Sequence, residues 1–231
     1  MDTTAEIAVI GGTGFYKFLE DVTEVKVDTP YGSPSDLISL GTLGGRRVAF
    51  LPRHGRHHQL PPHMVNYRAN LWALHELGVT RVIGPCAAGS LQPDVKPGDF
   101  VICDQFVDRT TGRKDTYYDG PSAVHISTAD PYCPEMRRIA IRAAQDMGAR
   151  FHPEVVLARE LGMCYVNVSL ITDYDAGLEG RPDVAPVTQD EVVRVFAEHN
   201  EILKDLIKRI IVAAPKERGC PCAEDLKRAK P

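Results

Sequence analysis

Short apolar runs alternate with amphipathic stretches along most of the chain. Apolar runs bounded by turn residues predict strands over residues 7–10, 36–40, 47–51, 81–83, 100–103 and 163–172. Apolar positions three and four residues apart predict helices over residues 62–78, 134–148, 154–161 and from 188 onward. Gly44-Gly45 predicts a hairpin turn, and the small residues 86–90 predict a turn after the strand 81–83. Thr188 with Glu191 forms a capping box. Strands and helices that take turns predict an α/β fold with a mixed central sheet and helices on both sides.

The alternation breaks at one place. The helix that ends at Gly148 is separated from the next predicted helix, 154–161, by only five residues, 149–153. Parallel strands need crossover connections, so two consecutive helices suggest that a strand and further residues are absent here. Residues 104–133, by contrast, are polar and rich in turn residues, which predicts a long functional loop.

Composition narrows the class of protein. With 231 residues, 43% hydrophobic and 25% charged, the sequence predicts a single domain over residues 1–231. The formal net charge of −4 gives no global attraction to nucleic acid or to an anionic membrane. No apolar run approaches the length of a membrane span, and residues 1–6 do not resemble a secretory signal, so we expect a cytoplasmic protein.

The six cysteines agree with a reducing compartment. Four of them are isolated in apolar or mixed sequence and are interpreted as reduced, semi-buried thiols: Cys86, Cys103, Cys133 and Cys164. Cys220-Pro-Cys222 has no second pair of ligands nearby in the sequence, so we expect tail cysteines that can oxidise and no metal site.

Gly11-Gly12-Thr13-Gly14 follows the first predicted strand. Its backbone N–H groups and one hydroxyl could receive an anion, although a plain tight turn is the better interpretation of this motif alone. The spacing fits neither the dinucleotide-binding fingerprint nor a Walker loop. A dinucleotide-dependent enzyme is therefore the least favoured function.

A basic loop, residues 52–58, follows the predicted strand 47–51. Arg53 carries a permanent charge on a planar fork of donors that suits phosphate oxygens, and His54 can add a hydrogen bond. A solvated basic loop is an equally good interpretation. A metal site made from His54, His57 and His58 is less favoured, because contiguous loop histidines without a carboxylate seldom form one.

Asp173 and Asp175 close the predicted strand 163–172. Residues i and i+2 share one side of a strand, so both carboxylates can face one pocket at the end of the strand, where α/β sheets place ligands. Two neighbouring carboxylates repel, so we expect one to hold its proton near neutral pH, ready to protonate a leaving heterocycle. An Asp-rich turn, a helix cap or a divalent metal site remain alternatives.

Taken together, these motifs resemble the methylthioadenosine phosphorylases of the trimeric purine nucleoside phosphorylase family. The resemblance follows the chain in order through residues 10–14, 29–32, 50–55, 61–70, 88–91, 96–100, 104–106, 117–120 and 172–175. It implies the mixed-sheet phosphorylase fold and a homotrimer with shared active sites. It also implies phosphorolysis of 5'-methylthioadenosine to adenine and 5-methylthioribose 1-phosphate, with inorganic phosphate as co-substrate and neither metal nor other cofactor.

The resemblance also implies roles for particular residues. Thr13, Arg53, His54, Cys86 and Ala87 match the phosphate-binding positions, although the family usually has serine or threonine where Cys86 stands, and a thiol is the poorer donor. Asp173, Tyr174 and Asp175 match the stretch that binds an adenine-type base, with Asp173 as general acid. His125 matches a residue that one subunit lends to its neighbour's alkylthio pocket.

The main departure lies between His152 and Pro153, where the family has a few dozen further residues that contact base, ribose and phosphate. Because both flanks match well, we favour a stretch omitted from the printed sequence over a genuine deletion form with an impaired site. A purine nucleoside phosphorylase for 6-oxopurine nucleosides is the nearest alternative function. A non-catalytic binding module follows if the deletion is genuine.

Overall fold

The computed structural model describes residues 3–12, 19–122, 124–149, 151–152, 158–175, 178, 184 and 188–229. Within them lies an eight-stranded mixed sheet in the order β2-β3-β4-β1-β5-β8-β6-β7. Its strands are β1 (Ile7–Gly11), β2 (Glu20–Val25), β3 (Ile38–Leu43), β4 (Arg46–Pro52), β5 (Arg81–Ser90), β6 (Phe100–Val101), β7 (Phe151–His152) and β8 (Cys164–Tyr174). The helices are the 3-10 turns η2 (Pro62–Met64) and η3 (Ala158–Leu161) and the α-helices α1 (Tyr67–Glu76), α2 (Pro134–Asp146), α3 (Gln189–Ala213) and α4 (Cys222–Ala229). The predicted α/β fold with a mixed central sheet is confirmed.

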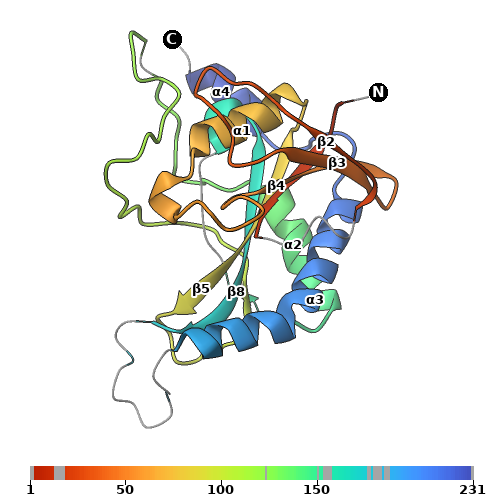
Figure 1. Ribbon diagram of the computed structural model, residues 1–231, viewed down its shortest axis with the longest axis vertical. Helices are drawn as coiled ribbons and strands as arrows, with labels where there is room; N and C mark the ends of the chain where they lie inside the picture. Colours follow the sequence, from red (N-terminus) through yellow and green to blue (C-terminus); the bar gives the residue numbers. More distant parts are fainter. Residues whose placement is uncertain are drawn as a thin grey trace.

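Helices cover both faces of the sheet (Figure 1). Alternate residues of β1 pack on opposite sides: Ile7 and Val9 join the core under α2 and α3, while Ala8 and Ile10 join the core under α1. A central strand that is buried on both faces must be apolar at every position, which explains its uninterrupted apolar run. Within the part of the chain that the structure describes, no helix combines the length and apolar character needed to span a bilayer.

Turn and cap residues in the sequence predicted most ends of helices and strands correctly. β3 and β4 pair antiparallel around Gly44 and Gly45, whose φ angles of 55° and 74° are the left-handed values that the predicted turn requires. The Thr188 side chain accepts a hydrogen bond from the Glu191 N–H (3.2 Å), as a capping box should. Residues 104–122 and 124–133 contain neither helix nor strand, as predicted.

Several elements differ from the prediction. The helix predicted from residue 62 begins only at Tyr67, because the Asn66 side chain caps it by accepting from the Ala69 N–H (3.2 Å). The strand predicted over 100–103 ends at Val101. Strand β2 and helix α4 were not predicted at all. Of the helix predicted over residues 154–161, residues 154–157 lie outside the described part and residues 158–161 form the 3-10 turn η3. The short strand β7 follows α2.

The turn predicted over residues 86–90 is wrong, because β5 continues through these residues to Ser90. Its small side chains allow close parallel pairing with β8 along the whole segment, from Arg81 opposite Cys164 to Ser90 opposite Tyr174. Backbone hydrogen bonds to β8 therefore outweigh the local turn preference.

Candidate functional site at the carboxyl edge of the sheet

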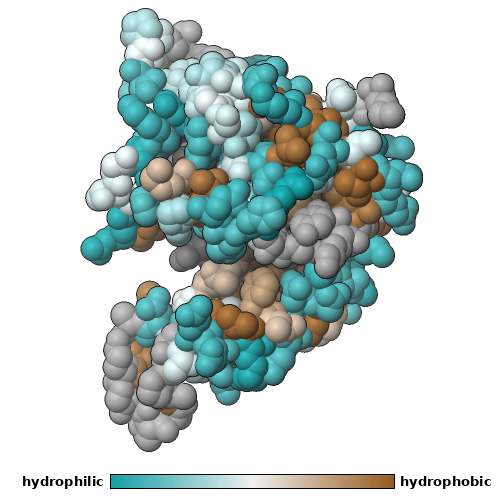
Figure 2. All heavy atoms as spheres, in the orientation of Figure 1, coloured by the Kyte–Doolittle hydropathy of each residue, from teal (hydrophilic) through white to brown (hydrophobic). Residues whose placement is uncertain are grey.

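Four parallel strands, β1, β4, β5 and β8, end at the same edge of the sheet. Gly11 is the register partner of Pro52, and the Arg53 backbone N–H donates to the Gly11 carbonyl (3.0 Å). This places Arg53 beside Gly11, at the carboxyl end of β1. The molecular surface is hollowed beside the ends of β5 and β8 (Figure 2). Ligands of open α/β sheets bind at such an edge.

Arg53 and His54 lie in a tight turn whose Gly55 has a φ of 76°. The His54 Nδ1–H donates to the Leu60 carbonyl (2.8 Å), which leaves Nε2 as the acceptor for the Arg53 Nε–H (3.4 Å). Burial lowers the pKa of His54 below 6.5, and the nearby charge of Arg53 lowers it further, against the opposing effect of the Leu60 hydrogen bond. The imidazole is therefore neutral near pH 7, and Arg53 supplies the positive charge of this turn.

Cys86 lies on the extended part of β5 and contacts two polar residues of β8. Its Sγ is 3.1 Å from the Ser169 Oγ and 3.4 Å from the Asn167 Nδ2. Asn167 also donates to the Gly84 carbonyl (2.8 Å) and accepts from the Cys103 thiol (2.8 Å). Polar groups that are withdrawn from water need such partners. The Cys86 thiol is thus held in a small polar network.

Sequence reasoning missed Asn167 and Ser169. The only available signal was that two polar residues stand at i and i+2 in an otherwise apolar strand. Ala87, which follows Cys86, is exposed. Beyond Ile83, β5 pairs with β8 but, among the described residues, not with β1. The backbone groups on its other edge are therefore turned toward the side of the sheet where Arg53 lies.

Asp173 and Asp175 flank Gly89 of β5. A Cβ atom on Gly89 would lie 3.0 Å from the Oδ2 of each carboxylate and 2.8 Å from the Asp175 Cβ. Both carboxylates therefore approach the same spot, as their i, i+2 spacing predicted. Thr172 Oγ1 donates to the Asp173 Oδ1 (2.5 Å), and the Asp175 N–H donates to the Ser90 carbonyl (2.7 Å). The missing side chain of Gly89 is what gives the pair its room.

Two other predicted site residues, Tyr174 and His125, make contacts away from this pair, and a third, Thr13, is not described. The Tyr174 hydroxyl donates to the Pro93 carbonyl (3.3 Å), so its side chain is held apart from the two carboxylates. The His125 N–H donates to the Ala229 carbonyl (3.4 Å) of α4, which packs at the opposite end of the sheet from the tips of β5 and β8 (Figure 1). Thr13 lies outside the described residues. The roles of all three stay predictions.

Two cavities lined by residues that the structure describes do not coincide with this edge. One, of about 310 Å³, is lined by Tyr67, Phe106, Asp108, Thr110, Arg113, Lys114, Asp115, Ile126, Thr128 and Glu160. Another, of about 540 Å³, is lined by His125, Ser127, Asp130, Pro134, Pro221, Asp225, Arg228 and Ala229. We assign the site to the sheet edge, because chemistry requires the converging charged and polar groups that lie there.

The interpretation of Cys133 and Cys164 as isolated thiols is wrong. The fold brings both together with Cys220 and Cys222, and all four Sγ atoms lie within 4.8 Å of one another. The expectation that the Cys-Pro-Cys pair has no partners is wrong for the same reason. Cys133 precedes α2, Cys164 begins β8, and the pair comes from the C-terminal segment, so no local pattern could connect them.

The fold and the edge site together define an α/β protein with a cationic turn at Arg53 and a pair of carboxylates, Asp173 and Asp175, at the ends of parallel strands. Comparison with known proteins gives the family. Residues 6–153 match the family model of the phosphorylase superfamily, and the chain belongs to this superfamily.

Close relatives bear two names. The chain is 48% identical to a purine nucleoside phosphorylase of Streptomyces coelicolor over 267 positions, covering 96% of this chain and 94% of the relative. It is also 48% identical to the S-methyl-5'-thioadenosine phosphorylase of Pyrococcus furiosus over 256 positions, covering 96% and 98%. A crystal structure of a methylthioadenosine phosphorylase from an antarctic soil metagenomic library superposes with a TM-score of 0.90 at 33% identity, covering 99% of this chain and 93% of that one.

Both sequence alignments are longer than the 231 residues of the chain, so these relatives contain residues that this chain lacks. The family match ends at residue 153, next to the predicted position of the missing segment. The position of the missing segment, between His152 and Pro153, stays a prediction.

Proposed function

We propose that the protein catalyses the phosphorolysis of 5'-methylthioadenosine to adenine and 5-methylthioribose 1-phosphate, as a pentosyltransferase. The observation that carries this proposal is the pair of carboxylates, Asp173 and Asp175, that converge on Gly89 at the sheet edge. A paired carboxyl group can donate a proton to a purine ring nitrogen while its neighbour accepts from an exocyclic amine. The relatives named for methylthioadenosine support the same substrate.

In the proposed reaction, phosphate occupies the space between Arg53 and the β5 edge at Cys86 and Ala87, with Thr13 of the preceding loop as a further ligand. It attacks the anomeric carbon from the side opposite the purine. Positive charge develops on the sugar in the transition state, and the phosphate dianion stabilises this charge while it attacks. Asp173 protonates the purine ring, so that adenine leaves as a neutral molecule. Positioning of the two reactants supplies much of the rate, and the reaction needs neither metal nor redox cofactor.

A homotrimer completes this proposal. The His125 N–H donates to the Ala229 carbonyl of α4, which packs at the opposite end of the sheet from the tips of β5 and β8, and this suits a residue that reaches the alkylthio pocket of a neighbouring subunit. We further propose that the enzyme works in the cytoplasm.

One experiment tests the substrate. Release of free base is measured for methylthioadenosine and for inosine, each with and without phosphate, on a preparation whose intact mass has been checked against 25.5 kDa. We expect fast, phosphate-dependent cleavage of methylthioadenosine and slow cleavage of inosine. Cleavage without phosphate would contradict the proposal.

The name of the Streptomyces relative favours one second candidate, a purine nucleoside phosphorylase for 6-oxopurine nucleosides. A preference for inosine in the same assay would establish it. If a chain of the printed mass cleaves neither nucleoside, the missing segment has impaired the site.

A further inference from the structure

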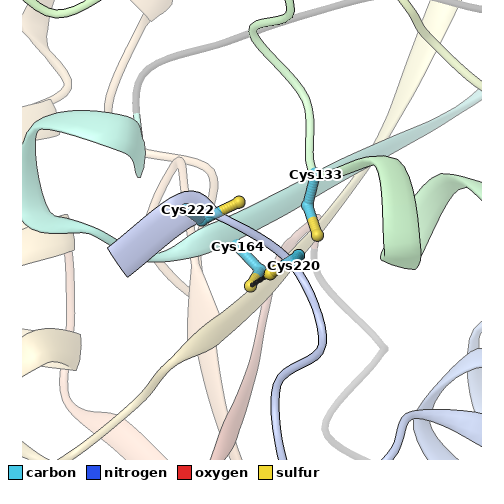
Figure 3. A group of neighbouring side chains, drawn as sticks. All are labelled: Cys133, Cys164, Cys220 and Cys222. Carbon is cyan, nitrogen blue, oxygen red and sulfur yellow. Dashed lines mark hydrogen bonds between the residues drawn. The ribbon is translucent and has the colours of Figure 1, made fainter. Parts of the chain in front are cut away.

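Four cysteine side chains gather between helix α2, strand β8 and the C-terminal segment (Figure 3). Cys133, Cys164 and Cys222 are buried, with exposed fractions of 1%, 0% and 2%, and Cys220 packs against the same apolar core. All four are free cysteines. The reaction proposed above uses none of them.

We propose that these four cysteines bind one structural Zn²⁺ ion. Zinc in structural sites takes four ligands in a tetrahedron, and four cysteine thiolates form one of its common ligand sets. With Zn–S bonds of about 2.3 Å, the sulfur atoms of such a tetrahedron lie about 3.8 Å apart. The observed sulfurs fit this geometry, because the Cys164 and Cys220 Sγ atoms are 3.2 Å apart and every pair lies within 4.8 Å.

The arrangement is one cluster of four rather than two separate pairs. A disulfide draws two sulfurs to about 2.05 Å and leaves the other two for a second bond. Here each sulfur has three neighbours at comparable range, from three segments that are distant in the sequence (Figure 3). One ion at the centre can satisfy all four at once.

The surroundings suit thiolates. Cys133 is the N-cap of α2, and its Sγ accepts from the Met136 N–H (3.5 Å). Cys222 is the first residue of α4. The N-terminal turns of two helices therefore border the cluster, and their positive ends stabilise the negative charge that remains on a zinc ion with four thiolates. Binding releases the thiol protons to solvent.

The segment that carries Cys220 is fixed from both sides of the cluster. The Gly219 N–H donates to Glu135, two residues after Cys133 (3.1 Å), and Arg218 donates to the Gly162 carbonyl, two residues before Cys164 (2.8 Å). These contacts hold the backbone where the Cys-Pro-Cys pair can reach the other two ligands. The metal would thus fasten α4, which contacts His125, to the central sheet.

The test compares the full-length protein with Cys164→Ser and Cys222→Ser. Cys103→Ser is the matched control, because this buried cysteine lies outside the cluster. All four proteins are produced with zinc in the medium and purified without chelator under reducing conditions. Metal content is measured by plasma mass spectrometry. We expect one zinc per chain in the wild type and in Cys103→Ser, and almost none in the two ligand variants.

A second measurement keeps the test decisive if a ligand variant fails to fold. Wild-type protein stripped of metal is titrated with Co²⁺, and we expect the visible bands of tetrahedral cobalt with a thiolate charge-transfer band at one equivalent. A wild-type protein without metal overturns the proposal, whether its intact mass shows four thiols or two disulfides. Zinc that persists in the ligand variants overturns it as well.

Discussion

At the scale of single residues, Asp173 and Asp175 share one side of β8 but differ in environment. Asp173 is half-buried and accepts a hydrogen bond from Thr172, whereas Asp175 is exposed. The more enclosed carboxyl group suits proton transfer, and the more exposed one suits recognition of the base.

We expect Asp173→Asn to lower kcat for methylthioadenosine by about two to four orders of magnitude, because the amide keeps its size but cannot supply the proton. KM should change much less. Asp175→Asn should instead shift the base preference toward 6-oxopurines, through its exchanged donors and acceptors. Steady-state kinetics of both variants on methylthioadenosine and inosine test these assignments. A larger loss of kcat in Asp175→Asn would reverse the assignment.

Arg53→Ala removes the charge that we assign to phosphate. The loss of a charge-assisted hydrogen bond costs about 1.5–3 kcal/mol, which corresponds to a rise in the KM for phosphate of about 10- to 150-fold. The KM for the nucleoside should change less. Arg56→Ala is the control, because the Arg56 guanidinium on the same loop pairs with Glu24 and Asp36. An equal rise in the KM for phosphate in Arg53→Ala and Arg56→Ala would mean that Arg53 does not bind the phosphate.

Cys86→Ser should leave phosphate use unchanged or improve it. The shorter side chain still fits between Asn167 and Ser169, and a hydroxyl is a better donor to phosphate than a thiol. The KM for phosphate, measured beside that of Cys103→Ser, checks this expectation. A large loss of activity in Cys86→Ser alone would mean that the thiol has another role.

At the scale of elements, an irregularity in the pairing of β5 with β8 shapes the site. Ala88 lies opposite Ile171, but Gly89 lies opposite Asp173, so Thr172 is an extra residue on β8. A bulge of this kind changes the direction of the side chains that follow it and is common beside active sites. It brings the two carboxylates against Gly89.

Gly89→Ala tests this arrangement. The new methyl group would meet the Asp175 Cβ at 2.8 Å and both carboxylates at 3.0 Å, so the pair must move. We expect kcat/KM for methylthioadenosine to fall strongly while the midpoint of urea unfolding changes little, because the displaced groups lie at a partly exposed strand end. An unchanged kcat/KM would show that the position of the carboxylates does not matter.

At the scale of the whole molecule, a single chain does not bring all the predicted site residues together. His125 lies against α4, and the loop that carries it has neither helix nor strand over residues 124–133. Val107 in the same loop region is 84% exposed, so its apolar side chain is accessible to a neighbouring subunit. Association with further copies would cover this region and supply His125 to a second site.

We therefore expect a homotrimer by light scattering at micromolar concentration. His125→Ala should raise the KM for methylthioadenosine more than the KM for adenosine, since only the former carries the alkylthio group. Ser127→Ala, in the same loop, is the control. A monomer that is fully active at the same concentration would contradict shared active sites.

The sequence alone determined the features that depend on neighbours along the chain. Apolar periodicity gave the α/β alternation, Gly44-Gly45 gave the hairpin, and Thr188 with Glu191 gave the start of α3, because turns and caps form within a few residues. The i, i+2 spacing likewise placed Asp173 and Asp175 on one side of a strand.

Tertiary structure decided the features that depend on segments far apart in the chain. Pairing with β8 extended β5 through a predicted turn, and the bulge at Thr172 set the carboxylates against Gly89. Asn167 and Ser169 became partners of Cys86, and four cysteines from three segments met in one cluster. Such contacts carry no local signature, because they arise only when the packing of the whole sheet and its helices brings the segments together.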